Sequence, residues 1–274
     1  MRTYAETVKI DNRDDLTLAV KDLKEGICDI YIWPMLGWLE IKQRYRRSIL
    51  GPFWLTISTG AMIGGMGPLY GRLFGLDLSS YFPHLAISFI VWMFIAGIIN
   101  DACTAFISAE GYIKQIKLPL TVHILRMVWK NLIVFAHNLV IILIVVLFWP
   151  PAVDWHIVLM PLGVLAIAVN GVWLGIFLGL LCARFRDIPQ IVSSLVLVAF
   201  FLTPVIWKAD MLGNNQWAAT WNPLYHFLEV VRAPLVAGAT SWLSWTVVLG
   251  ITLIGYAVTF VVFARFRARV AYWV

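Results

Sequence analysis

The stretch Trp221–Leu235 reads WNPLYHFLEVVRAPL and lies between two hydrophobic segments of a very apolar chain. It is too apolar and too aromatic for an ordinary solvated loop. Pro223 and Pro234 bracket a run with Asn222 placed to cap it, which predicts a short helix over 224–233. Because this connection is apolar and helical, we first ask in which environment the two flanking segments lie.

The amino-acid composition indicates the environment of these segments. Hydrophobic residues make up 61% of the 274 residues and charged residues 13%, against about 25% charged in a typical soluble domain. A chain this apolar is a membrane protein. Met1–Gly26 is polar and lacks the apolar core and cleavage site of a signal peptide, so residues 1–33 are predicted to be a retained cytosolic segment.

Six segments approach the ~20 apolar residues that a helix needs to cross the hydrocarbon core. They are Pro52–Tyr70, Leu85–Ile107, Leu132–Trp149, Ile157–Cys182, Ile191–Trp207 and Leu243–Ala264. The predicted fold is therefore all-α and integral to the membrane. It has a six-span domain over 52–264 and a tail over 265–274.

The connections between these spans differ sharply in basic residues. Every second connection is rich in Lys and Arg: Lys42, Arg44, Arg46, Arg47, Lys114, Lys117, Arg126, Lys130, Arg184, Arg186, Arg265, Arg267 and Arg269. The opposite set carries only Arg72, Lys208 and Arg232. The positive-inside rule then places both termini in the cytosol, and the net charge of +6 reflects topology rather than nucleic-acid binding.

The segment 34–51 precedes the first span. Its apolar residues, from Met35 to Tyr45, can share one helical face, and the basic residues lie mostly elsewhere. This pattern predicts an amphipathic helix in the plane of the membrane interface. The alternative is a plain cluster of charges that stops translocation.

Two glycine stripes predict close helix packing in lipid. One lies in the fourth span, at Gly171, Gly175 and Gly179, and the other in the first, at Gly60, Gly64, Gly67 and Gly71. Either stripe could build the fold of one chain or a seam between two copies.

Ionisable residues inside the spans are few, mainly Asp101 and His137. For His137 a hydrogen bond between helices is favoured over a proton relay. The scarcity argues against a channel or an ion-coupled carrier. The chain also lacks a phosphate-binding loop, metal-ligand spacing, and a close carboxylate pair for glycosyl transfer. We therefore expect no catalytic residue, no metal site and no cofactor in this chain.

Four motifs occur in order along the chain. They are RYRRSILGPFW at Arg44–Trp54, ARFRDI at Ala183–Ile188, TPVIW at Thr203–Trp207 and the run Asn222–Leu235. Together they resemble the membrane subunits of type-2 ATP-binding-cassette exporters, most closely those that export O-antigen, capsular polysaccharide or teichoic acid. The resemblance covers about residues 30–270 and leaves the N-terminal 26 residues outside.

The resemblance implies a homodimeric permease in the bacterial cytoplasmic membrane, carrying two ATPase subunits that bind ATP and Mg on the cytosolic side. Two cytosolic loops are then candidates for docking to the ATPase: Glu110, Lys114 and Lys117 in the first, and Arg184, Arg186 and Asp187 in the second. An ordinary membrane-proximal loop is the alternative for the first. Pairing of Arg186 with Asp187, or capping of a helix that ends before Pro189, is the alternative for the second.

The outer connection Lys208–Ser241 is predicted to dip back toward the membrane as a re-entrant gate, because buried irregular backbone needs protein or a water-filled cavity around it. Glu229 and Arg232 can pair at i,i+3 spacing. The residues assigned to the gate or to glycan contact are Trp217, Trp221, Tyr225, Phe227, Glu229 and Arg232. Anchoring in the aromatic belt at the membrane surface is the alternative for the aromatic residues.

The expected function is the export of a polyprenyl-diphosphate-linked glycan, with Arg44, Arg46 and Arg47 attracting the diphosphate at the cytosolic mouth. Membrane lipid is the other expected contact. A drug or lipid exporter of the same superfamily is the first alternative. A membrane-bound enzyme of glycan or lipid assembly is the second.

Overall fold

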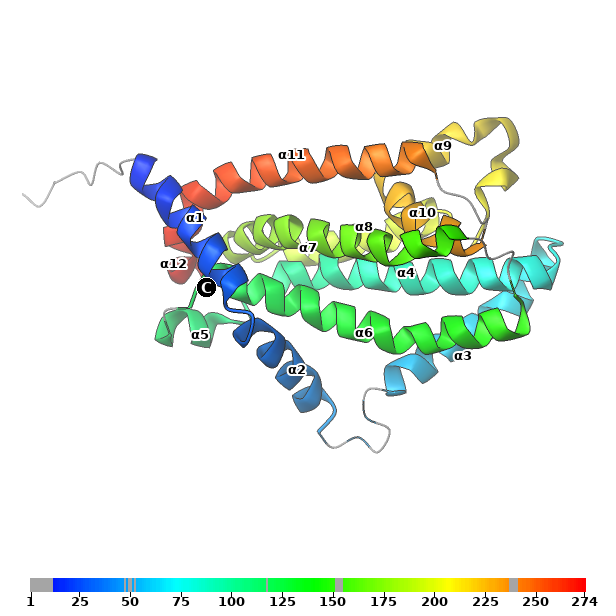
Figure 1. The fold of residues 1–274 in the computed structure, drawn as a ribbon, viewed down its shortest axis with the longest axis horizontal. Helices are drawn as coiled ribbons and strands as arrows, with labels where there is room; N and C mark the ends of the chain where they lie inside the picture. The colour runs from blue at the N-terminus through cyan, green and yellow to red at the C-terminus, as the bar shows by residue number, and fades with distance from the viewer. Residues whose placement is uncertain are drawn as a thin grey trace, which may run out of the picture.

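The computed structural model describes residues 12–46, 48, 51, 53–116, 118–150, 155–236 and 241–274, with side chains from residue 16 onward. These residues form helices and contain no strand. Long helices run along the length of the molecule, and α2 crosses them obliquely (Figure 1). The first and last helices, α1 and α12, lie at the same end.

The helices follow one another with short connections. Before the core lie α1 (Asn12–Cys28), α2 (Ile32–Arg44) and α3 (Phe53–Leu73). The middle of the chain forms α4 (Leu78–Thr104), α5 (Glu110–Gln115), α6 (Leu120–Phe148), α7 (Leu159–Arg184) and α8 (Ile188–Leu202). The last part forms α9 (Trp217–Thr220), α10 (Pro223–Val236), α11 (Trp242–Phe266) and α12 (Val270–Trp273).

Four helical stretches of the described chain are long and apolar enough to cross a membrane. They are Leu78–Thr104, Leu120–Phe148, Trp155–Arg184 and Trp242–Trp273. The protein is therefore a multi-pass α-helical membrane protein. The other two predicted spans also coincide with helices, α3 and α8, but α8 has 15 residues, fewer than the ~20 that span a bilayer upright.

Helix α4 is the centre of the bundle. It packs against α3, α6, α7, α8 and α10, and most of its side chains are buried. The glycine stripe of α7 makes this packing close, since a Cβ on Gly175 would lie 2.7 Å from Ile124 Cγ2, and one on Gly179 would lie 2.9 Å from Phe106. These glycines therefore pack against other segments of the same chain, so this stripe does not form a seam between two copies.

The polar N-terminal segment contributes a helix that docks on the bundle. Asp22 of α1 is 1% exposed and accepts hydrogen bonds from the backbone N–H groups of Leu120 (3.1 Å) and Thr121 (3.0 Å). It also accepts from Thr121 Oγ1 at 2.8 Å and pairs with Arg267 Nε at 2.9 Å. Asp22 thus caps the N-terminus of α6 from another helix, where free N–H groups and the helix dipole favour a carboxylate.

Two details of the predicted topology need correction. The connection between the predicted spans Leu85–Ile107 and Leu132–Trp149 is shorter, because α6 already begins at Leu120 and buries Arg126 and Lys130. The predicted hydrogen bond between helices at His137 is made by its backbone: among the described residues, its ring Nδ1 lies 2.8 Å from the Ile133 carbonyl of its own helix. Its backbone carbonyl instead accepts from Thr56 Oγ1 at 3.3 Å.

Replacing Asp22 with alanine should detach α1 from the bundle. The change leaves two N–H groups of α6 uncapped and a partly buried Arg267 unpaired, so we expect the free energy of unfolding to fall by about 3 kcal/mol or more. Trypsin should then cut faster at Lys21 and Lys24. Glu25→Ala is the matched control, because Glu25 is exposed and its ion pair with Lys21 is long, at 3.7 Å. Equal thermal stability and equal cleavage of the two variants would contradict this role of Asp22.

Candidate functional site

Helix α10 forms the core of a polar cluster at the end of the bundle opposite α1 (Figure 1). The sequence predicted this helix, its cap and its internal ion pair, and all three are present; the helix continues through Pro234 to Val236, beyond the predicted end at 233. Leu224 N donates to Asn222 Oδ1 at 2.9 Å, and Arg232 Nη2 lies 2.5 Å from Glu229 Oε2. α10 packs against α4, α7 and α11 rather than extending into solvent.

Arg232 joins three parts of the chain. Its side chain is 5% exposed. Nη1 donates to the carbonyl of Pro204 at 2.7 Å and to Ser88 Oγ of α4 at 3.0 Å. The guanidinium therefore holds α10, α4 and the chain that follows α8 together, and Glu229 neutralises its charge.

Further hydrogen bonds fix the same region. Tyr81 of α4 donates its hydroxyl to the carbonyl of Ile206 at 2.6 Å, and Asn222 Nδ2 donates to Thr203 Oγ1 at 2.8 Å. The ring of His226 bridges Ser244 Oγ of α11 (2.9 Å) and the Thr220 carbonyl (2.8 Å). Tyr81 and Ser244 thus tie the chain between α8 and α11 to the long helices α4 and α11, and the other two bonds hold that chain to itself.

The aromatic residues assigned to this site divide into two groups. Trp217 and Trp221 are 61% and 82% exposed, so their rings are free for contacts outside the chain. Tyr225 is half-buried, and its ring lies 6.0 Å from the Arg232 guanidinium carbon. Phe227 is buried and faces an internal cavity, so its ring does not reach the surface.

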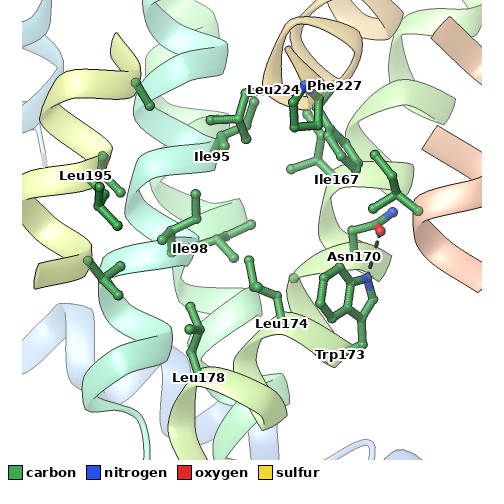
Figure 2. A pocket seen from close by; sticks show the side chains of 17 residues that line it. Ile95, Ile98, Ile167, Asn170, Trp173, Leu174, Leu178, Leu195, Leu224 and Phe227 are labelled. Atoms are coloured by element: carbon green, nitrogen blue, oxygen red, sulfur yellow. Dashed lines mark hydrogen bonds between the residues drawn. The ribbon is translucent and has the colours of Figure 1, made fainter. Parts of the chain in front are cut away.

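That cavity has a volume of about 390 Å³ and lies between α4, α7, α8 and α10. Figure 2 shows Ile95 and Ile98, Leu174 and Leu178, Leu195, and Phe227 with Leu224 around it. Its one polar side chain, Asn170, is satisfied by the Ala166 carbonyl, Thr252 and Trp173. The cavity therefore offers no unpaired polar group to a ligand.

Two short segments at the α1 end carry the residues assigned to ATPase docking. On α5, Lys114 Nζ lies 2.7 Å from Glu110 Oε1, and this hydrogen bond holds the pKa of the exposed Glu110 carboxyl below its usual range. Ile116 beside them is 50% exposed. Lys117 lies outside the described residues.

The second segment joins α7 to α8. Arg186 donates to the backbone carbonyl of Trp273 at 3.1 Å, and the guanidinium carbon of Arg184 lies 5.4 Å from the centroid of the Trp273 ring. Both residues are thus tied to α12 and exposed at one surface. Asp187 is the residue before α8, and its side chain makes no capping bond. The alternative was that it caps a helix ending before Pro189; in the structure α7 ends at Arg184 and α8 begins at Ile188.

The basic residues assigned to the cytosolic mouth lie at the end of α2. Arg44 and Arg46 are exposed. Arg44 also lines a small polar cavity between α3, α4 and α6. Arg47 lies outside the described residues.

Sequence reasoning missed a charged network between α2, α4 and α6. Lys130 Nζ lies 2.8 Å from Glu40 Oε1 and 2.9 Å from Asp101 Oδ2, and Glu40 also faces Arg126 at 3.6 Å. Asn131 Nδ2 donates to Asp101 at 2.7 Å. The available signal was the spacing of Arg126, Lys130 and Asn131 on one face of an otherwise apolar helix.

No group of three or more His, Cys, Asp or Glu side chains among the described residues could hold a metal ion. The arrangement at both ends of the bundle is one of structural bonds and exposed basic and aromatic side chains. The Ser244 hydroxyl, which lies 2.9 Å from the His226 ring, is 1% exposed, so this pair is buried between α10 and α11.

Comparison with known proteins gives consistent matches. A family model described as "ABC-2 type transporter" matches residues 33–236. The O-antigen export system permease protein RfbA of Myxococcus xanthus is 27% identical over 182 residues, which are 65% of this chain and 68% of that one. A protein of the same name from Klebsiella pneumoniae is 24% identical over 239 residues, covering 83% and 88% of the two chains.

Substitution of Arg232 by glutamine should loosen the outer cluster. Glu229 would lose its partner and the Pro204 carbonyl its donor, so the free energy of unfolding should fall by about 3 kcal/mol or more. Thermal unfolding of the purified protein measures this. The same substitution at the exposed Arg72 should leave the melting temperature nearly unchanged. Equal melting temperatures for both variants would show that Arg232 does not hold the cluster together.

Proposed function

The chain belongs to the ABC-2 type transporter family, and we propose that it is the membrane-spanning subunit of an ATP-driven exporter of an O-antigen-like polysaccharide. The observation that carries the proposal is the family match over 33–236, joined by relatives that are named O-antigen export permeases. The match extends from α2 through α10 and so includes both clusters described above.

ATP hydrolysis would take place in a partner, because the chain has no phosphate-binding loop. We expect two ATP-binding-cassette subunits on a homodimer of this chain. The exposed residues Glu110, Lys114, Arg184, Arg186 and Asp187 support docking at the α5 and α7–α8 surfaces, since their charges face outward.

In this proposal the chain crosses the bacterial cytoplasmic membrane six times, with α3 and α8 as the first and fifth spans. Both termini are cytosolic, which agrees with the bias of Lys and Arg toward the α1 end. α10 re-enters from the outer side. Its burial against α4, α7 and α11 supports this placement.

The conduit would form where two copies meet. α3 and α8 are suited to line it, because much of their surface is uncovered within one chain: α8 has no buried residue, and Gly64 of α3 has open space beside it. The exposed rings of Trp217 and Trp221 stand at the outer end, where aromatic faces can stack on passing sugars. Outer gate residues Tyr225, Phe227, Glu229 and Arg232 would then act by fixing α10.

The cytosolic mouth would lie beside α2. Met35 and Trp38 are 55% and 52% exposed on this helix, whereas Gly37 and Ile41 face the bundle. An apolar exposed face fits a helix in the membrane interface. Arg44, Arg46 and Arg47 at its end supply positive charge for the diphosphate of a lipid-linked glycan.

Purification of the tagged chain from its native membrane in mild detergent should recover an ATPase subunit in near-equal amount. Deletion of the gene should leave the lipid-linked glycan inside the cytoplasmic membrane. Lys114→Glu should lower the recovered ATPase several-fold. An exposed pair such as Glu110–Lys114 contributes little to stability, so that loss would come from the interface.

Isolation of the chain without any ATPase, repeated in lipid nanodiscs, would contradict the proposal. Normal export after deletion would contradict the assigned cargo and favour a drug or lipid exporter. Lys21→Glu on α1 is the control for Lys114→Glu, since Lys21 is equally basic and exposed.

Reversing the charge at Arg44 and Arg46 should reduce glycan export several-fold while leaving membrane insertion intact. The reason is electrostatic, because two acidic side chains at the mouth would repel a diphosphate. Export is measured as glycan reaching the outer side of the membrane per amount of permease. Unchanged export with normal expression would remove this role from α2.

A further inference from the structure

A small polar cavity lies inside the cytosolic half of the bundle. Its volume is about 170 Å³, and it is bounded by the end of α2 and by α3, α4 and α6. At this depth the medium outside the protein is hydrocarbon, so a polar cavity must be filled by the protein's own groups, by water or by a polar ligand.

One end of the cavity is charged. Asp101 and Lys130 line it and pair with each other at 2.9 Å, and Arg44 stands beside them. Glu40 and Arg126 complete the set from behind, since Glu40 contacts Lys130 at 2.8 Å and Arg126 at 3.6 Å. Three positive and two negative side chains leave an excess of one positive charge.

The other end carries neutral polar groups, one of which lacks a hydrogen-bond partner among the described residues. Asn138 is 3% exposed, and its Oδ1 has no hydrogen-bond partner within the described chain. Thr59, which is 6% exposed, lines the same space from α3. A buried amide oxygen without a partner is rare in folded proteins and points to an unseen hydrogen-bond donor. On α6, Lys130 and Asn138 are eight residues apart, so the cavity spans about 12 Å.

The charge balance limits what can occupy this cavity. A metal cation would face an excess of positive charge. A diphosphate carries at least two negative charges and would leave net negative charge uncompensated at membrane depth, which is costly. A neutral ligand that both donates and accepts hydrogen bonds meets neither penalty, and the amide of Asn138 can serve it in both directions.

The size and walls of the cavity fit a single ring. An engineered protein cavity of about 150 Å³ takes one benzene molecule, so 170 Å³ holds the ring of one sugar residue, and the substituents of that ring extend through the open side of the cavity. Phe94 and Phe135, whose ring centroids are 4.9 Å apart, form apolar walls beside the polar groups. A sugar residue matches both kinds of wall, because its hydroxyl groups donate and accept hydrogen bonds and the faces of its ring are apolar.

We propose that this cavity binds one neutral sugar residue of the exported glycan, with Asn138 and Thr59 at the inner end and Asp101 and Lys130 at the charged end. The inference rests on the proposed export function and names the site at which the permease recognises the glycan. Arg44 at the mouth then meets the charged lipid carrier while the sugar occupies the cavity.

The test compares two probes on the permease–ATPase complex in nanodiscs: a polyprenyl diphosphate carrying one N-acetylhexosamine, and the same lipid without the sugar. The wild-type complex should bind the sugar-bearing lipid about tenfold more tightly, a difference of about 1.4 kcal/mol. Asn138→Leu should abolish this preference without changing the affinity for the bare lipid. Thr59→Val, which removes only the hydroxyl, should reduce the preference.

The matched control is Asn100→Leu. The Asn100 amide bonds to the Ala96 carbonyl of its own helix and does not line the cavity, so the preference should persist. Equal affinity of the wild-type complex for the two lipids would show that the cavity holds water only and would overturn the inference. So would a preference that survives in a folded Asn138→Leu complex, or one that keeps its full wild-type size in a folded Thr59→Val complex.

Failure of this inference and failure of the proposed function are separable. If the wild-type strain exports the glycan and its complex shows no preference for the sugar, the cavity is not the recognition site. If the complex binds neither lipid and deletion leaves export normal, the proposed function itself is wrong.

Discussion

The absence of water in the hydrocarbon core is the constraint on which this structure depends. A polar group there must find its partner inside the protein. The chain meets this demand where distant segments converge: Lys130 lies between Glu40 and Asp101, and Arg232 lies among α4, α10 and the chain after α8. These contacts decide which helices lie side by side, because each one would be costly to break.

Apolar packing supplies the rest of the bundle, and it is uneven. α4 is buried along most of its length against α6 and α7, where glycines on α7 allow close contact. α8, by contrast, has no buried residue and borders the large apolar cavity. Helices with few buried contacts open at low free-energy cost. Movement during a transport cycle is therefore best accommodated at α3 and α8, while α4, α6 and α7 hold their places.

Local signals in the sequence predicted local structure well. The N-cap at Asn222 and the pair of Glu229 with Arg232 needed only neighbouring residues, and both are present. The partners of Asp22 lie 98 and 99 residues away, so no local pattern could reveal them. Lys130 was assigned to a charged loop because the positive-inside rule considers only the positions of basic residues. The rule takes no account of the ion pairs that allow a lysine to be buried in a helix. Buried pairs depend on tertiary contacts, which a single sequence does not display.

The two polar clusters share a helix, and this determines how one can influence the other. Asp101 and Ser88 both belong to α4, where they are 13 positions apart, which corresponds to about 20 Å of helix. A displacement of α2 acts on Lys130 through Glu40, and Lys130 is bonded to Asp101. Ser88, at the other end, is bonded to Arg232 and so to α10. The end of the bundle that carries α2 and the connection that carries α10 are therefore joined through α4 by a continuous series of ion pairs and hydrogen bonds.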